Sequence, residues 1–159
     1  MPYRTFQGSL DASQLRIGVV VSRFNEFITE QLAKGALEVL EKHGCLHSNI
    51  RFVKVPGAWE LAVAAKHLAP QCDAIVALGA VVRGDTPHFD FVAGGAAEGL
   101  NRVSLDTGVP VAFGVLTTDT DEQAEARAGG AHGNKGWDAA VATLEMIDLH
   151  NRVDPDDAD

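Results

Sequence analysis

The chain has 159 residues, about the length of one ordinary domain, and 46% of them are hydrophobic and 22% charged. This composition is that of a packed globular protein and excludes collagen, coiled coils and wholesale disorder. The formal net charge of −9 would repel nucleic acids and anionic bilayers, so neither is an expected partner.

Nothing in the sequence predicts a membrane span or a secreted protein. The longest nearly apolar stretch, residues 74–82, is far shorter than a membrane-spanning helix requires. The first ten residues contain no apolar run of signal-peptide length, so we expect a cytoplasmic protein. The two cysteines, Cys45 and Cys72, form no disulfide framework and are expected to be reduced thiols.

Short apolar runs alternate with helical patterns from residue 17 onward. Strands are predicted over residues 17–21, 51–55, 74–78 and 111–116, and helices over residues 26–43 (with Asn25 as N-cap), 59–69, 88–105, 122–128 and 136–151. Strand and helix alternation with such short connections predicts an α/β fold. We expect a flavodoxin-like three-layer α/β/α sandwich around a central four-stranded parallel sheet.

The whole chain, residues 1–159, is predicted to be one domain, because no linker, repeat or low-complexity segment interrupts the pattern. Residues 1–15 form an N-terminal arm and residues 153–159 an acidic tail. Tyr3–Phe6 has the composition of an edge strand, yet no other predicted strand is available to pair with it. We therefore expect the arm to add a strand to the sheet of a neighbouring subunit.

In an open parallel sheet, ligands bind beyond the carboxyl ends of the strands. The residues that follow the first three predicted strands are 22–25, 56–60 and 79–88, and Phe113 lies within the fourth. Together they supply aromatic, acidic, hydroxyl and imidazole side chains, as well as several glycines. This set suits a flat polar heterocycle that carries hydroxyls, with a small anion nearby.

Two segments are candidates for binding that anion. Residues 84–88 open a helix, whose N–H groups and the Thr86 hydroxyl could bind an anion, although Asp85 or Thr86 could instead be an ordinary N-cap. Arg127 and Lys135 flank a glycine-rich turn and are either a second cationic wall or a solvated basic patch. A nucleotide P-loop is excluded, because no hydroxyl residue follows Lys135.

Other candidate residues also have structural interpretations. His88 suits proton transfer near neutral pH, but a lone histidine is more often structural. Phe24 is either a stacking platform or a hydrophobic staple for the next helix, and Glu60 either binds hydroxyls or interacts with a helix dipole. Phe113 on an apolar strand would ordinarily belong to the core. The segment 43–47 has two histidines and a cysteine but no fourth ligand, so we expect no metal.

Several segments, taken together and in order, resemble lumazine synthase over about residues 17–149. They are Arg23-Phe24-Asn25, Val55-Pro56-Gly57-Ala58-Trp59-Glu60, Gly79 through Asp90 (GAVVRGDTPHFD), Phe113-Gly114-Val115-Leu116-Thr117 and the run from Arg127 to Gly136. Each segment alone is weak, whereas all of them in the family's order and spacing are highly specific.

The resemblance implies a transferase of riboflavin biosynthesis that needs no cofactor. In this family 5-amino-6-(D-ribitylamino)uracil condenses with 3,4-dihydroxy-2-butanone 4-phosphate to give 6,7-dimethyl-8-ribityllumazine, phosphate and water. The alternative is a paralogue that binds flavin or lumazine with little turnover.

The resemblance also implies a role for each matching residue. Phe24 resembles the residue that stacks on the pyrimidinedione, and His88 the residue that transfers protons. Phe113 resembles a residue that enters the site from an adjacent chain. The other matches are the ribityl contacts Ala58 and Glu60 with Trp59 beside them, the backbone contacts Ala80, Val81 and Val82 to the ring edge, and the phosphate-binding residues Asp85, Thr86, Arg127 and Lys135.

The sequence departs from the family pattern at three places: Trp59 replaces the usual Phe, Gly94-Gly95 an Asn-Glu-like pair, and His132 a frequent Lys. The loss of a carboxylate at Gly95 is what keeps the paralogue alternative open. For assembly, the resemblance implies a homo-oligomer built from pentamers. The compact turn 129–136 resembles members whose pentamers close into an icosahedral shell.

Overall fold

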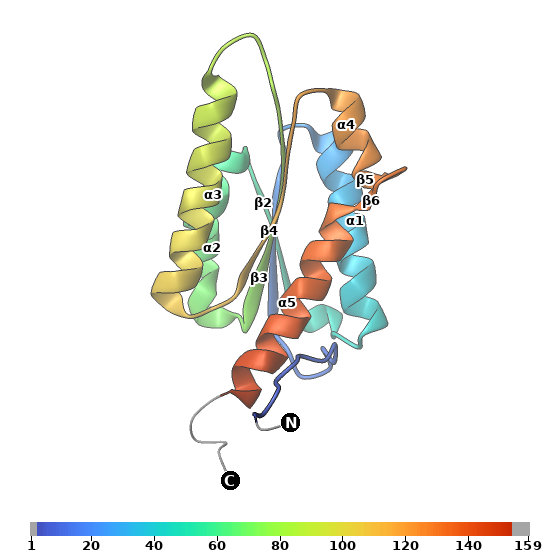
Figure 1. Cartoon of the computed structure of the whole chain (residues 1–159), viewed down its shortest axis with the longest axis vertical. Helices are drawn as coiled ribbons and strands as arrows, with labels where there is room; N and C mark the ends of the chain where they lie inside the picture. The colour runs from blue at the N-terminus through green and yellow to red at the C-terminus, as the bar shows by residue number, and fades with distance from the viewer. Residues whose placement is uncertain (1–2, 154–159) are drawn as a thin grey trace.

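A four-stranded parallel sheet in the order β2-β1-β3-β4 forms the middle layer of the protein (Figure 1). The computed structural model describes residues 3–153. The strands are β1 (Ile17–Ser22), β2 (Ile50–Val55), β3 (Ala74–Val82) and β4 (Val111–Thr118). β1 pairs in parallel with β2 and β3, and β3 pairs in parallel with β4, so the predicted sheet is confirmed.

Helices cover both faces of this sheet (Figure 1). α1 (Glu26–Lys42) and α5 (Lys135–Arg152) lie on one face, and α2 (Leu61–Leu68) and α3 (His88–Thr107) lie on the other. α4 (Asp121–Ala126) follows β4, and the short strands β5 (Ala128–Gly130) and β6 (Gly133–Asn134) form a hairpin before α5. Single 3-10 turns are η1 (His47–Asn49), η2 (Ala58–Glu60) and η3 (Ala69–Gln71).

The central strand β1 is buried along its whole length and contributes to two cores. Ile17, Val19 and Val21 pack toward α1 and α5, whereas Val20 packs toward α2 and α3. Alternate side chains of a strand point to opposite faces of the sheet, so a strand covered on both faces needs apolar residues throughout. This is why the run IGVVV predicts a buried parallel strand.

Two strands are longer than the sequence predicted. β3 continues to Val82 and β4 to Thr118, and the added residues pair as Val81↔Thr117 and Val82↔Thr118. Ala80, Val81 and Val82 therefore lie on a strand and not in the loop that was expected. The two extensions hold each other in register, a long-range pairing that neither local pattern reveals.

The N-terminal arm contains no strand between residues 4 and 16, so the strand predicted at Tyr3–Phe6 is not formed in this chain. The arm instead lies against its own helices: Ser9 N donates to Asp148 Oδ2 (2.7 Å) and Ala12 N donates to the His43 carbonyl (2.9 Å). Whether the arm pairs with a neighbouring subunit stays a prediction. Residues 154–159 of the acidic tail lie outside the described residues.

Between residues 3 and 153, no helix is both long enough and apolar enough to cross a lipid bilayer. Helices that share a face of the sheet pack closely, and glycines make the closest approaches possible. At Gly136, the first turn of α5 meets the backbone of α1: a Cβ placed there would lie 2.7 Å from the Leu32 carbonyl carbon and 2.9 Å from its Cα.

We expect Gly136→Ala to destabilise the protein by about 1–3 kcal/mol, because backbone atoms of α1 cannot move aside independently. Gly94→Ala in α3 is the matched control, since a Cβ there meets no atom of the described chain within 4 Å. That change should be neutral or stabilising by up to about 1 kcal/mol through helix propensity. Urea unfolding monitored by circular dichroism measures both, and a Gly136→Ala protein as stable as the control would contradict the packing argument.

Candidate active site

A hollow of about 770 Å³ lies beyond the carboxyl ends of β1 and β3, between η2 and the start of α3. This volume is within the range of small-molecule sites. Most of the predicted site residues line it: Phe24, Ala58, Trp59, Glu60, Ala80, Val81, Val82, Thr86 and His88. The remaining lining residues are Pro56, Gly57, Gly84, Phe89, Phe91 and Val92. The structure thus brings together side chains from three separate segments at the edge of the sheet where a ligand was expected.

Phe24 stands on the turn between β1 and α1. Arg23 N donates to the Val55 carbonyl (2.8 Å) and Phe24 N to the Pro56 carbonyl (3.0 Å), so this turn is bound to the end of β2. Phe24 is 72% exposed. A ring this exposed does not pack against the following helix as a hydrophobic staple would, so it is free to contact a ligand.

Asn25 stabilises the same turn in a way that the sequence did not predict. Its backbone has a left-handed conformation (φ 62°), and its side chain makes no capping hydrogen bond to α1. Its Nδ2 donates instead to the Ala80 carbonyl at 2.9 Å. The position of the helix start was correct, but the side chain joins β3 to the turn because the left-handed backbone directs it across the sheet edge.

The loop from Arg83 to Pro87 leads into α3, and His88 is the first residue of that helix. The helix N-cap is Pro87, without a side-chain cap, so capping by Asp85 or Thr86 in the usual sense is not observed. The Thr86 hydroxyl accepts a long hydrogen bond from His88 N (3.4 Å). Asp85 is exposed in this loop.

Arg83 holds the base of that loop, a role that the sequence did not assign to it. Its Nε donates to Asp119 Oδ1 (2.8 Å), and its guanidinium lies 4.4 Å from the centre of the Phe89 ring. The hydrogen bond to Asp119 raises the pKa of Arg83 above its ordinary value. Arg83 therefore links the end of β4 to the first turn of α3, next to His88.

The other predicted residues line different hollows, on the β4 side of the chain. Phe113 and Arg127 line a hollow of about 550 Å³, and Arg127 and Lys135 line another of about 510 Å³ together with His132. Phe89 lines both the hollow that contains Phe113 and the one that contains His88, so the two hollows are adjacent. Within the described chain, the hollow that contains Phe24 and His88 is separate from the two hollows that contain Arg127.

The local structure explains why these residues face outward. β4 is an edge strand, and Phe113 on it is 39% exposed, so the core interpretation of this residue is wrong. Arg127 ends α4 and donates from Nη1 to the Gln123 carbonyl (2.9 Å). Lys135 opens α5, which Asn134 caps by accepting hydrogen bonds from Gly136 N and Trp137 N.

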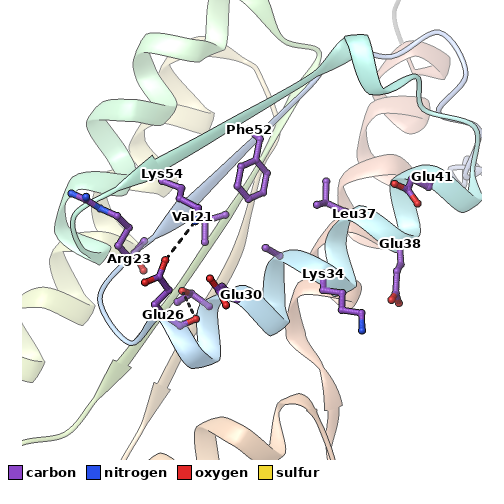
Figure 2. Close-up of a pocket in the computed structure, with 13 residues that line it drawn as sticks. Val21, Arg23, Glu26, Glu30, Lys34, Leu37, Glu38, Glu41, Phe52 and Lys54 are labelled. Atoms are coloured by element: carbon purple, nitrogen blue, oxygen red, sulfur yellow. Dashed lines mark hydrogen bonds and ion pairs between the residues drawn. The ribbon is translucent and has the colours of Figure 1, made fainter.

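A further hollow, of about 500 Å³, lies between α1 and β2 (Figure 2). Val21 and Leu37 form part of its apolar floor with Phe52, which is 43% exposed, and several glutamates of α1 surround it. Lys54 Nζ lies 3.5 Å from Glu26 Oε1 at one end. This hollow borders the open edge of β2, on the opposite side of the sheet from the hollows that contain Arg127.

Across residues 3–153, no group of three or more His, Cys, Asp or Glu side chains is arranged to hold a metal ion. In the segment 43–47, His47 Nε2 is paired on the surface with Glu41 Oε1 (3.0 Å). Cys45 and Cys72 are buried and free, and burial raises the pKa of both thiols. These cysteines have the character of core residues and not of nucleophiles.

Comparison with known protein families gives a match. The family model described as 6,7-dimethyl-8-ribityllumazine synthase matches residues 14–151. The match includes the hollow at the carboxyl ends of β1 and β3 and both hollows that contain Arg127.

The role of Asn25 can be tested with two substitutions that separate its two contributions. Asn25→Gly keeps the left-handed backbone and loses only the bond to Ala80, so we expect a loss of about 0.5–1.5 kcal/mol. Asn25→Ala should cost about 1–2 kcal/mol more, because alanine disfavours a positive φ. Chemical unfolding of the variants measures these differences, and equal stability of the alanine and glycine variants would contradict the strain argument.

Proposed function

The chain belongs to the 6,7-dimethyl-8-ribityllumazine synthase family, an enzyme family of riboflavin biosynthesis, and from this premise we propose its reaction. It condenses 5-amino-6-(D-ribitylamino)uracil with 3,4-dihydroxy-2-butanone 4-phosphate to give 6,7-dimethyl-8-ribityllumazine, phosphate and water. The observation that carries the proposal is the hollow in which Phe24, Glu60 and His88 meet, within the matched residues. We expect no metal or organic cofactor, and the cytoplasmic location stays a prediction from the sequence.

We assign the pyrimidine to the hollow beside β1 and β3. The exposed ring of Phe24 offers a face on which a planar heterocycle can stack. The backbone of Ala80, Val81 and Val82 borders the same hollow and can read the edge of the ring. Ala58, Trp59 and Glu60 on η2 then face the ribityl chain, where the Glu60 carboxylate can accept hydrogen bonds from its hydroxyls.

The chemistry requires protons to be moved several times. The amine attacks the ketone and the adduct loses water to form an imine; phosphate is then eliminated, and ring closure expels a second water. His88, at the start of α3 and on the wall of the hollow, is the residue that we assign to these transfers. Holding the two substrates side by side in one site also accelerates the first attack by proximity.

The departing phosphate needs cations, and these lie in the hollows that Arg127 lines. We call these hollows the cationic half-site, and the hollow that contains Phe24 and His88 the aromatic hollow. We propose that adjacent chains of a ring combine the aromatic hollow of one chain with Phe113, Arg127 and Lys135 of the next. Thr86 and Asp85 in the loop before α3 complete the phosphate site from the first chain. The support for this arrangement is the separation of the two half-sites within one chain and the outward position of β4.

We propose a cyclic pentamer as the smallest active assembly. The open edge of β2, with the hollow beside it, is a surface that the N-terminal arm of a neighbour could cover (Figure 2). The compact β5–β6 hairpin favours closure of pentamers into an icosahedral shell. Light scattering distinguishes these assemblies, since a mass of one ring would refute the shell and an active monomer would refute the ring.

The proposed reaction is tested by incubating the protein with both substrates and following lumazine fluorescence and phosphate release. We expect the wild-type protein to form lumazine. The His88→Ala variant should react about 10²–10⁴-fold more slowly, and the pH dependence of its rate should differ. His150→Ala, which changes an exposed residue of α5, is the control and should leave the rate unchanged. Binding of lumazine without turnover by the natural chain would instead identify the non-catalytic paralogue.

The shared site is tested by mixing two defective chains in one assembly. His88→Ala and Arg127→Ala damage different half-sites, so co-expressed and doubly tagged assemblies should recover about a quarter of the natural activity. This fraction is the chance that an intact aromatic hollow meets an intact cationic half-site when the two chains mix at random. If both halves came from one chain, every site would keep one defect, and the activity would not exceed the mean of the two parents.

A further inference from the structure

Two of the departures from the family pattern, Trp59 and Gly95, are in contact in the folded protein. Trp59 lies on η2, and its indole covers Gly95 of α3. A Cβ at Gly95 would lie 2.8 Å from Trp59 Cε3, and it would be closer still to Cζ3. Cβ atoms do not approach other atoms this closely, so the observed position of the indole requires glycine at residue 95.

Withdrawal of α3 from the indole to admit a side chain would break its packing against α2 and the core. Gly99, one turn further along α3, packs closely against α2, where a Cβ would lie 2.7 Å from Ala62 Cβ. Ala96 and Leu100, between and beyond these glycines, are buried in the core. Trp59, in contrast, is 62% exposed and has room to rotate. A side chain at residue 95 would therefore displace the indole and leave the fold intact.

A displaced indole would change the proposed substrate pocket. Trp59 and its chain neighbours Ala58 and Glu60 line the same hollow as His88. Gly95 lies seven residues after His88, about two turns along the same face of α3. The position of the indole thus determines the shape of the hollow between η2 and α3, where the ribityl chain of the substrate would lie.

Resting on the proposed function, we propose that Gly95 is a positioning residue that seats Trp59 and so sets the fit of the ribityl chain in the pocket. Gly95 itself touches no substrate in this proposal.

The test compares Gly95→Ala with Gly94→Ala, which makes the same substitution in the same helix where no atom of the described chain lies within 4 Å of the new Cβ. Trp59 and Trp137 are the two tryptophans, so a Trp137→Phe background reports on Trp59 alone. We expect Gly95→Ala to shift the emission of Trp59 and Gly94→Ala to leave it unchanged. An unchanged emission in Gly95→Ala overturns the proposal.

Kinetics give the second readout. We expect Gly95→Ala to raise the KM for the ribitylaminouracil about tenfold, with a smaller change in kcat and in the KM of the butanone phosphate. In a Trp59→Ala background the same substitution should have no further effect, because the indole is absent. A Gly95→Ala effect that persists in this background overturns the proposal.

The fluorescence readout separates this inference from the proposed function. If the natural chain turns over but Gly95→Ala is indistinguishable from Gly94→Ala, the positioning role fails and the reaction stands. If the natural chain does not turn over, the reaction fails, and the emission of Trp59 still decides the seating. Should Gly95→Ala not fold, recovery of folding in the double variant with Trp59→Ala supports the contact, and failure to recover overturns it.

Discussion

Burial of β1 on both faces is the constraint from which the rest of the structure follows. Its six residues are all buried, between β2 and β3 in the sheet and between two layers of helices. Its two neighbours run parallel to it, and parallel strands need crossover connections, which here bring the carboxyl ends of the strands to one edge. The turn after β1 and the end of β3 therefore meet, and the hollow between them contains most of the candidate site residues.

Polar contacts then fix the loops at that edge. Asn25 joins the β1–α1 turn to Ala80, and Arg83 joins the loop before α3 to Asp119 at the end of β4. Each contact links segments that are distant in the chain, so the orientation of the loops depends on the completed sheet. Phe24 lies on the first of these loops, and His88 directly follows the second. The sheet therefore positions both side chains, although neither residue belongs to a strand.

The same sheet order leaves β2 and β4 as edges within the described residues 3–153, and it separates two groups of candidate site residues. The aromatic hollow lies beside β1 and β3, whereas Phe113, Arg127 and Lys135 lie on the β4 side. The proposed condensation, which releases phosphate, needs both a platform for the heterocycle and cations for the anion. The structural reason to propose a shared site is that the aromatic platform and the cations of one chain line different hollows.

The sequence by itself determined the four strands of the main sheet, the main helices and the two-sided burial of β1, because periodicity and apolar runs are local properties of a chain. It did not predict the short strands β5 and β6, and the strand that it predicted at Tyr3–Phe6 is not formed in this chain. The resemblance that its motifs carry gave the family, which the comparison over residues 14–151 confirms. Tertiary structure alone decided that β3 reaches Val82, because its last residues pair with β4. It also decided that Asn25 bonds to Ala80 and that Trp59 occupies the space at Gly95. These contacts join segments that are far apart in the sequence. They depend on how the folded chain brings those segments together, which no local pattern encodes.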